Sequence, residues 1–132
     1  MTDEEYQEEA FLDLVSMLWT DNGLELSGNT LLRLRQRREY VRAALPGLDE
    51  RVPMYPEGAA WMAEYQHRAD RWVADNKVRA EHGQAAWDGV ILQTAYIALS
   101  QTDDELRENE LLDLAAICVA GYEASRARRA TA

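Results

Sequence analysis

An uncharged apolar segment, followed at once by an amphipathic one, most constrains what this chain can fold into. Residues 89–102 contain no charged side chain, and in the residues that follow, up to residue 120, apolar positions recur three and four apart. Between the two segments, Thr102 and Glu105 have the spacing of a capping box, which predicts a helix N-terminus directly after a short turn. Helices joined by so short a turn are antiparallel neighbours. The sequence therefore predicts a helical hairpin here.

The rest of the chain adds further helices and no strand. Apolar residues recur at helical spacing elsewhere, and nowhere do apolar and polar residues alternate as in a half-buried strand. Pro46, Pro53 and Pro56 interrupt the helical pattern, and Gly83 is placed to end a helix as a C-cap residue. The predicted helices run to about residue 19, from about 30 to 45, from about 61 to 82, from 87 or 88 to 100, and from about 103 to 127.

We therefore predict an all-α fold, a bundle of about five helices in a single domain that comprises residues 1–132. Its predicted parts are an N-terminal helical hairpin (1–45), a linker (46–58) and a C-terminal group of helices (59–130). A chain of 132 residues is long enough to bury one hydrophobic core. The tryptophans lie on apolar faces and are expected in that core. They are Trp19, Trp61, Trp72 and Trp87.

Charge and composition exclude several classes of function. The chain has 14 Lys and Arg against 24 Asp and Glu, so nucleic acid, whose phosphates attract clustered cations, is not an expected partner. The longest uncharged run is shorter than the roughly 18 apolar residues of a membrane span, and the acidic N-terminus does not resemble a secretory signal. The lone Cys118 lies in an apolar run, where a thiol is expected to pack as an inert hydrophobe. We expect a cytoplasmic protein with no membrane association.

The predicted hairpin also carries the residues that point to chemistry. Its antiparallel arrangement allows Gln93, Thr94 and Ile97 on one helix to face Glu110 and Asp113 on the other. The segment WDGVILQTAYIALSQTDDELRENELLDLAAICVAGYEASRARR resembles the C-terminal half of MazG-like all-α nucleoside triphosphate pyrophosphohydrolases. The paired helices of that family carry E-E-x-x-E and, after a turn, E-x-x-D.

This resemblance covers roughly residues 72–130 and implies a magnesium site. In the family the acids bind Mg²⁺, a hard cation that bridges the nucleotide phosphates while water attacks. Placed without gaps on this sequence, E-E-x-x-E falls on the three neutral residues named above, whereas E-x-x-D is retained as Glu110 and Asp113. The resemblance therefore implies Mg²⁺ as the cofactor, these two acids as its remaining ligands, and weak or no hydrolysis.

Two further roles are open to Glu110 and Asp113 without a metal. Acids in the first two turns of a helix favour the positive end of its dipole, and Arg107 is close enough in sequence to pair with them. Alternatively, both acids point inward and meet a cation of the long helix predicted to end near residue 82. Candidates for that cation are Arg68, Arg71 and Lys77.

A basic face on the helix predicted from about residue 30 to 45 is a candidate phosphate site. Arg35, Arg38 and Arg42 share that face, within the segment RLRQRREYVR. A guanidinium group binds two phosphate oxygens at once, so the face could hold a di- or triphosphate. The alternative is a solvated face, or one neutralised by the acidic residues 4–13.

Three functions remain open. The first is a degenerate MazG-like helical module that binds a nucleotide or a protein and forms a homo-oligomer, as its apolar helices and the dimers of the family imply. The second is a magnesium-dependent pyrophosphohydrolase with a rewired site, in which Asp88, Asp103 or the N-terminal glutamates replace the missing ligands. The third is a purely structural or inhibitory interaction protein whose function lies in residues 1–58.

Overall fold

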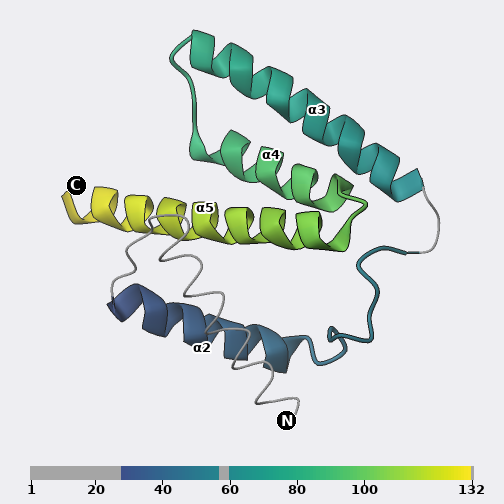
Figure 1. The fold of residues 1–132 in the computed structure, drawn as a ribbon. Coiled ribbons are helices and arrows are strands. Elements are labelled where there is room, and N and C mark those ends of the chain that lie inside the picture. The colour runs from purple at the N-terminus through teal and green to yellow at the C-terminus, as the bar shows by residue number, and fades with distance from the viewer. Residues whose placement is uncertain (1–27, 57–59, 132) are drawn as a thin grey trace. The chain divides into compact units, whose positions relative to one another are not determined.

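The structure, a computed structural model, describes residues 28–56 and 60–131. Within these ranges the chain is helical and contains no strand, which confirms the all-α prediction (Figure 1). The helix predicted to end near residue 19 lies outside the described residues. The described helices are α2 (Gly28–Ala44), α3 (Ala60–Glu81), α4 (Trp87–Ser100) and α5 (Asp104–Thr131).

The chain divides into two compact units, whose described parts are residues 28–56 and residues 60–131. The first part contains α2, followed by turns and no further helix through residue 56. The second part contains α3, α4 and α5. The prediction of a single domain stays a prediction.

α4 lies between α3 and α5 and packs against both (Figure 1). Every residue from Ile91 to Ser100 is buried or half-buried, because the helix has a neighbour on each of two sides. A charged side chain at these positions would lose hydration without gaining a partner, which is costly. This explains why the only acid of α4, Asp88, lies in its first turn. None of the described helices is long and apolar enough to cross a membrane.

The buried apolar side chains of this helical unit are small. They are Ala69 of α3, Ala98 of α4, and Ala116 and Val119 of α5. Small contact residues allow two helices to approach closely. The approach is closest at Gly89, where an added Cβ would collide with the side-chain oxygen of Asn76 on α3.

The prediction that the tryptophans form the core is wrong for those in the described residues. Trp61 and Trp87 are 47% and 43% exposed, and Trp72 is half-buried. The buried apolar side chains of this unit are three alanines and one valine, so its described interior is filled by small side chains rather than by indole rings. The large aromatic rings therefore lie at the edges of the helix contacts. Trp19 lies outside the described residues.

The end of α3 confirms the predicted role of Gly83. This residue has φ 68°, in the left-handed region that glycine adopts without strain. The Gly83 amide donates to the Ala80 carbonyl at 3.1 Å, and the Gln84 amide donates to the Arg79 carbonyl at 2.7 Å. This pair of bonds is the Schellman motif, which satisfies carbonyls that the helix end would leave unpaired.

The start of α5 differs from the predicted capping box. Asp103, rather than Thr102, is the cap, because the Leu106 amide donates to Asp103 Oδ1 at 2.9 Å. An aspartate next to the threonine is the better cap, since its charge also favours the positive end of the helix dipole. α5 also continues to Thr131, beyond the predicted end.

Replacing Gly83 with Ala should destabilise the protein by about 1 kcal/mol, because alanine resists the left-handed backbone that ends α3. The measurement is the free energy of unfolding in urea. Gly47→Ala is a matched control, since Gly47 has no positive φ and no described atom lies within 4 Å of an added Cβ. Equal effects of the two substitutions would contradict the role given to Gly83.

Candidate functional site

A groove of about 570 Å³ lies between α4 and α5. Gln93, Thr94 and Ile97 of α4 line it together with Glu110 and Asp113 of α5. The structure therefore brings together all five residues that the sequence placed on facing helices. The other lining residues are apolar: Trp87, Ala116, Ile117 and Ala120.

The two groove carboxylates are not neutralised by a cation of the described chain. Glu110 is half-buried and Asp113 is exposed. Burial, and then the negative charge of Asp113, raise the pKa of Glu110 above its ordinary value. Among the described residues, neither carboxylate has an ion pair. A carboxylate in this setting is stabilised either by taking up a proton or by a cation supplied from outside.

The cations that were expected to neutralise these acids lie elsewhere. Arg107 pairs with an aspartate in the first turn of α5. Arg68 pairs with Glu64 on its own helix, at 2.9 Å. The other two candidates, Arg71 and Lys77, have no ion pair within residues 28–56 and 60–131. Neither expected pairing of the groove acids is therefore formed.

The helix dipole also contributes little to the stability of these two carboxylates. α5 begins at Asp104, so Glu110 lies in its second turn and Asp113 in its third. The favourable effect of the positive helix end falls off within the first turn. The positions of Glu110 and Asp113 are thus better explained by the groove than by the dipole.

The α4 wall of the groove is held in place by α3. The Asn76 side-chain amide donates to the Gly89 carbonyl at 2.9 Å and to Gln93 Oε1 at 2.8 Å. A backbone carbonyl only accepts, so the Asn76 atom that faces it must be the NH₂ group. Gln93 consequently turns its oxygen toward Asn76 and keeps its own NH₂ group as a donor.

Thr94 has its hydrogen-bonding needs met within α4. It is buried, and its hydroxyl donates to the Val90 carbonyl at 2.8 Å. Ile97 is half-buried and apolar. Where the resembled family has three glutamates, the groove therefore presents an amide, an internally bonded hydroxyl and a hydrocarbon side chain. None of these adds negative charge to the two acids across the groove.

The groove fits a magnesium ion only in part. Within the described ranges, no group of three His, Cys, Asp or Glu side chains is placed to hold a metal ion. Magnesium, however, commonly takes only one or two carboxylates from the protein and fills its octahedral shell with water and substrate phosphates. Glu110 and Asp113 suit that second arrangement, since both carboxylates line the same groove.

The residues considered as replacement ligands have other roles. Asp88 accepts a hydrogen bond from Arg79 Nη1 at 2.8 Å and a second from the Gly89 amide at 2.7 Å. Both bonds lower the pKa of Asp88, the bond from Arg79 most. Asp103 caps α5. The N-terminal glutamates lie outside the described residues.

The predicted phosphate-binding arginines belong to the other compact unit. Arg35, Arg38 and Arg42 lie on α2. Glu39 Oε1 accepts from Arg38 at 2.8 Å and from Arg42 at 3.4 Å. Two of the three guanidinium groups therefore share one carboxylate of their own helix, whereas the acidic residues 4–13 of the predicted alternative lie outside the described residues. Arg35 is exposed.

Sequence reasoning missed two features of the site and one of the outer face of α5. Asn76 carries no motif, although a glycine inside a predicted helix, Gly89, signals a close approach by a neighbour. Trp87 lines the groove, and a Cβ added to Gly121 would lie 3.4 Å from its indole. Cys118 is exposed, so the expectation that it packs as a hydrophobe is wrong. An apolar run in a helix contains exposed positions because each turn of the helix has an outer face.

Asn76→Ala should lower the free energy of unfolding by about 1–3 kcal/mol, because it removes two part-buried hydrogen bonds and leaves Gln93 Oε1 without its donor. Gln66→Ala is the matched control on the same helix, since Gln66 is exposed and bonds only within α3, to Asp70. The control should change stability by less than about 0.5 kcal/mol. Urea denaturation compares the two, and a neutral Asn76→Ala would exclude the proposed bridge.

Glu110→Gln should stabilise the protein at neutral pH, because the raised pKa means that the ionised carboxyl is less favourable in the folded state than in the unfolded state. The gain should be complete above the folded pKa and should vanish as the pH falls below the ordinary value of 4.5, where both states are protonated. The measurement is unfolding in urea across this pH range. Glu108→Gln, which removes an exposed carboxylate of α5 outside the groove, is the control for the loss of one negative charge. A gain for Glu110→Gln that does not vary with pH would argue against a desolvated carboxylate.

Comparison with known proteins identifies no relative of this chain. No model of a protein family, no characterised protein and no solved structure matches it. The resemblance to MazG-like pyrophosphohydrolases therefore stays a prediction, based on the α4–α5 hairpin and its E-x-x-D motif.

Proposed function

We propose that this chain is a degenerate MazG-like helical module whose α4–α5 groove binds a nucleotide together with Mg²⁺ and hydrolyses it weakly or not at all. The observation that carries this proposal is that Glu110 and Asp113 line one groove with the neutral residues Gln93, Thr94 and Ile97. Half of the acidic constellation expected from the resemblance is present, and it lies opposite the positions from which the other half is missing.

The electrostatics of the groove favour a cationic ligand. Glu110 has a raised pKa and no ion pair among the described residues, so a cation that reaches it replaces lost hydration with a direct attraction. Nucleotide phosphates would supply the oxygens that the protein does not, because magnesium binds readily to a few carboxylates and several phosphate oxygens. Bound there, Mg²⁺ would neutralise phosphate charge. The apolar wall with Trp87 is suited to a nucleobase.

The expectation of weak hydrolysis follows from the residues of α4 that line the groove. Efficient metal-assisted hydrolysis needs a metal ion held in a fixed geometry, so that it activates water and stabilises the leaving group. Two carboxylates on one helix hold an ion less rigidly than acids on two facing helices. Gln93 is bonded to Asn76, and the hydroxyl of Thr94 is bonded within α4, so neither replaces an acid.

The alternative of a rewired pyrophosphohydrolase has less support. Of its suggested substitute ligands, Asp88 pairs with Arg79 and Asp103 caps α5. Using either as a metal ligand would cost the structure a contact that it already makes. The N-terminal glutamates are the remaining candidates for that alternative.

A protein-binding role in a homo-oligomer is the second candidate, and exposed apolar side chains favour it. On α4 and α5, Val90, Leu106 and Tyr122 are exposed in addition to Trp87, and Leu106 is 55% exposed. Large exposed apolar side chains on one helical pair favour association with another protein or a second copy of the chain. The third alternative, a purely structural or inhibitory protein, would place the function in residues 1–58 instead.

The test of nucleotide binding is a thermal-shift panel of nucleoside and deoxynucleoside triphosphates with and without Mg²⁺. A nucleotide at about one hundred times its dissociation constant should stabilise the fold by roughly 2.7 kcal/mol, which raises the melting temperature by several degrees. The shift should require Mg²⁺ and should be lost in Glu110→Gln but kept in the control Glu108→Gln.

The products then separate the alternatives. Binding without release of pyrophosphate supports the degenerate module, whereas metal-dependent release would favour the rewired enzyme. A panel with no shift, on protein shown to be folded, would exclude nucleotide binding and leave the protein-binding candidates. Their test is the oligomeric state measured by light scattering, for the full chain and for a variant with Leu106→Glu on the exposed surface of α5.

A further inference from the structure

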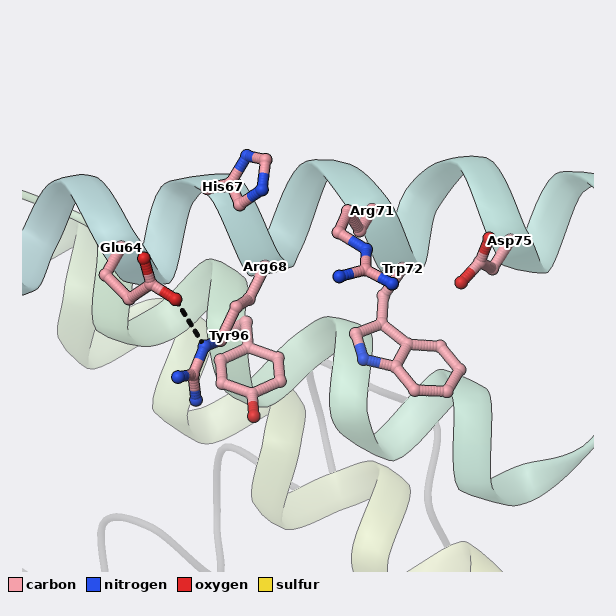
Figure 2. Close-up of a pocket in the computed structure, with 7 residues that line it drawn as sticks. All are labelled: Glu64, His67, Arg68, Arg71, Trp72, Asp75 and Tyr96. Carbon is pink, nitrogen blue, oxygen red and sulfur yellow. Dashed lines mark hydrogen bonds and ion pairs between the residues drawn. The ribbon is translucent and has the colours of Figure 1, made fainter.

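A second cleft, of about 400 Å³, is lined by residues of α3 and by Tyr96 of α4. None of the functions above uses it. Its walls include two aromatic rings, Trp72 of α3 and Tyr96 of α4 (Figure 2). Arg68, Arg71 and Asp75 of α3 line it as well. Its volume lies within the roughly 300–1,000 Å³ that small-molecule sites occupy.

Both aromatic walls are held in place by arginines. The Arg68 guanidinium lies over the Tyr96 ring, 5.7 Å from its centroid, and its Nε donates to Glu64 at 2.9 Å (Figure 2). Arg79 lies over the Trp72 ring at 5.3 Å. These contacts favour the observed orientations of the two rings in the absence of a ligand, which lowers the conformational entropy that the rings would lose on binding.

The cleft also has one positive and one negative group without a partner in the described chain. Arg71 and Asp75 lie one helical turn apart, and neither has a hydrogen bond or ion pair among the described residues. Arg68, by contrast, is already paired with Glu64. Within residues 28–56 and 60–131, the cleft therefore offers an available guanidinium and an available carboxylate, about 5–6 Å apart at their Cβ atoms, next to two aromatic rings.

We propose that this cleft binds an aromatic α-amino acid. Its carboxylate would bind Arg71, its ammonium group would bind Asp75, and its ring would contact Trp72 and Tyr96. The match is one of charge, because an α-amino acid carries a carboxylate and an ammonium group on the same α carbon. An anion without the ammonium group would meet Asp75 unpaired, and a cation without the carboxylate would meet Arg71 unpaired.

A direct pair between Arg71 and Asp75 is the competing arrangement, and it is a weak one. An exposed pair of this spacing contributes only a little stability, and the order with the cation first along the helix is the less favourable one. The structure does not form it. A ligand that offers each group a partner of opposite charge, and a ring to the aromatic walls, therefore competes well.

The test uses the full chain and three probes: L-phenylalanine, phenylacetate, which lacks the ammonium group, and phenethylamine, which lacks the carboxylate. Binding is followed by the NMR shift of the Trp72 indole N–H, assigned by comparison with Trp72→Phe. L-Phenylalanine should give a saturable shift, and each single-charge probe should bind about tenfold more weakly or worse. Equal binding of all three probes, or no saturable shift, would overturn the proposal.

Two variants test the charges separately. Arg71→Gln should weaken L-phenylalanine and phenylacetate by about tenfold and leave phenethylamine unchanged or improved, whereas Asp75→Asn should weaken L-phenylalanine and phenethylamine. Both residues are exposed and make no polar contact with the described residues, so both variants should fold, which circular dichroism checks. Arg128→Gln and Asp70→Asn are matched controls outside the cleft and should bind all probes normally. Binding of L-phenylalanine that neither Arg71→Gln nor Asp75→Asn weakens would refute the assignment.

Discussion

α4 has a helix packed against each of two sides, and the rest of the described helical unit depends on that position. The contact with α3 is possible because Gly89 has no side chain, which lets Asn76 reach the Gly89 carbonyl and Gln93. The Schellman turn at Gly83 ends α3 shortly before α4 begins. On the other side, the buried Ala116 of α5 lines the groove that α5 forms with α4. A helix enclosed in this way cannot carry charges, and from Ile91 to Ser100 it carries none.

The acids of the groove differ from several other acids in that no positive group of the described residues compensates them. Most acids with a described structural role either pair with arginine, as Glu64 and Asp88 do, or cap a helix, as Asp103 does. Glu110 does neither, and burial together with Asp113 raises its pKa. An uncompensated carboxylate is a cost to folding, so a protein that retains one beside a groove is expected to gain something from it. This cost, together with the placement of Glu110 and Asp113 in one groove, favours a ligand that brings a cation.

Helix positions could be predicted from the sequence because they depend on local periodicity. α4 was predicted with both ends correct, and Gly83 was predicted to end α3. That Gln93 faces Glu110 could also be predicted, because two helices joined by a short turn lie antiparallel and side by side. The errors concern choices between neighbours: Asp103 rather than Thr102 as the cap of α5, and exposure rather than burial for Cys118. The cap is a choice between two adjacent side chains that can both accept the bond, whereas the exposure of Cys118 depends on how α5 is rotated against its neighbours, which local sequence does not specify.

What the sequence by itself determined is the all-α class, the uncharged α4 and the pair of acids that faces it, because spacing along a helix dictates which residues share a face. Tertiary structure alone decided that Asn76 orients Gln93, that the groove acids lack a cation among the described residues, and that Arg71 and Asp75 line a separate cleft together with Tyr96 of α4. The physical reason is the separation along the sequence over which each kind of interaction acts. Helical periodicity acts over a few residues, whereas hydrogen bonds and charge pairing between helices depend on distances between side chains that lie far apart in the sequence.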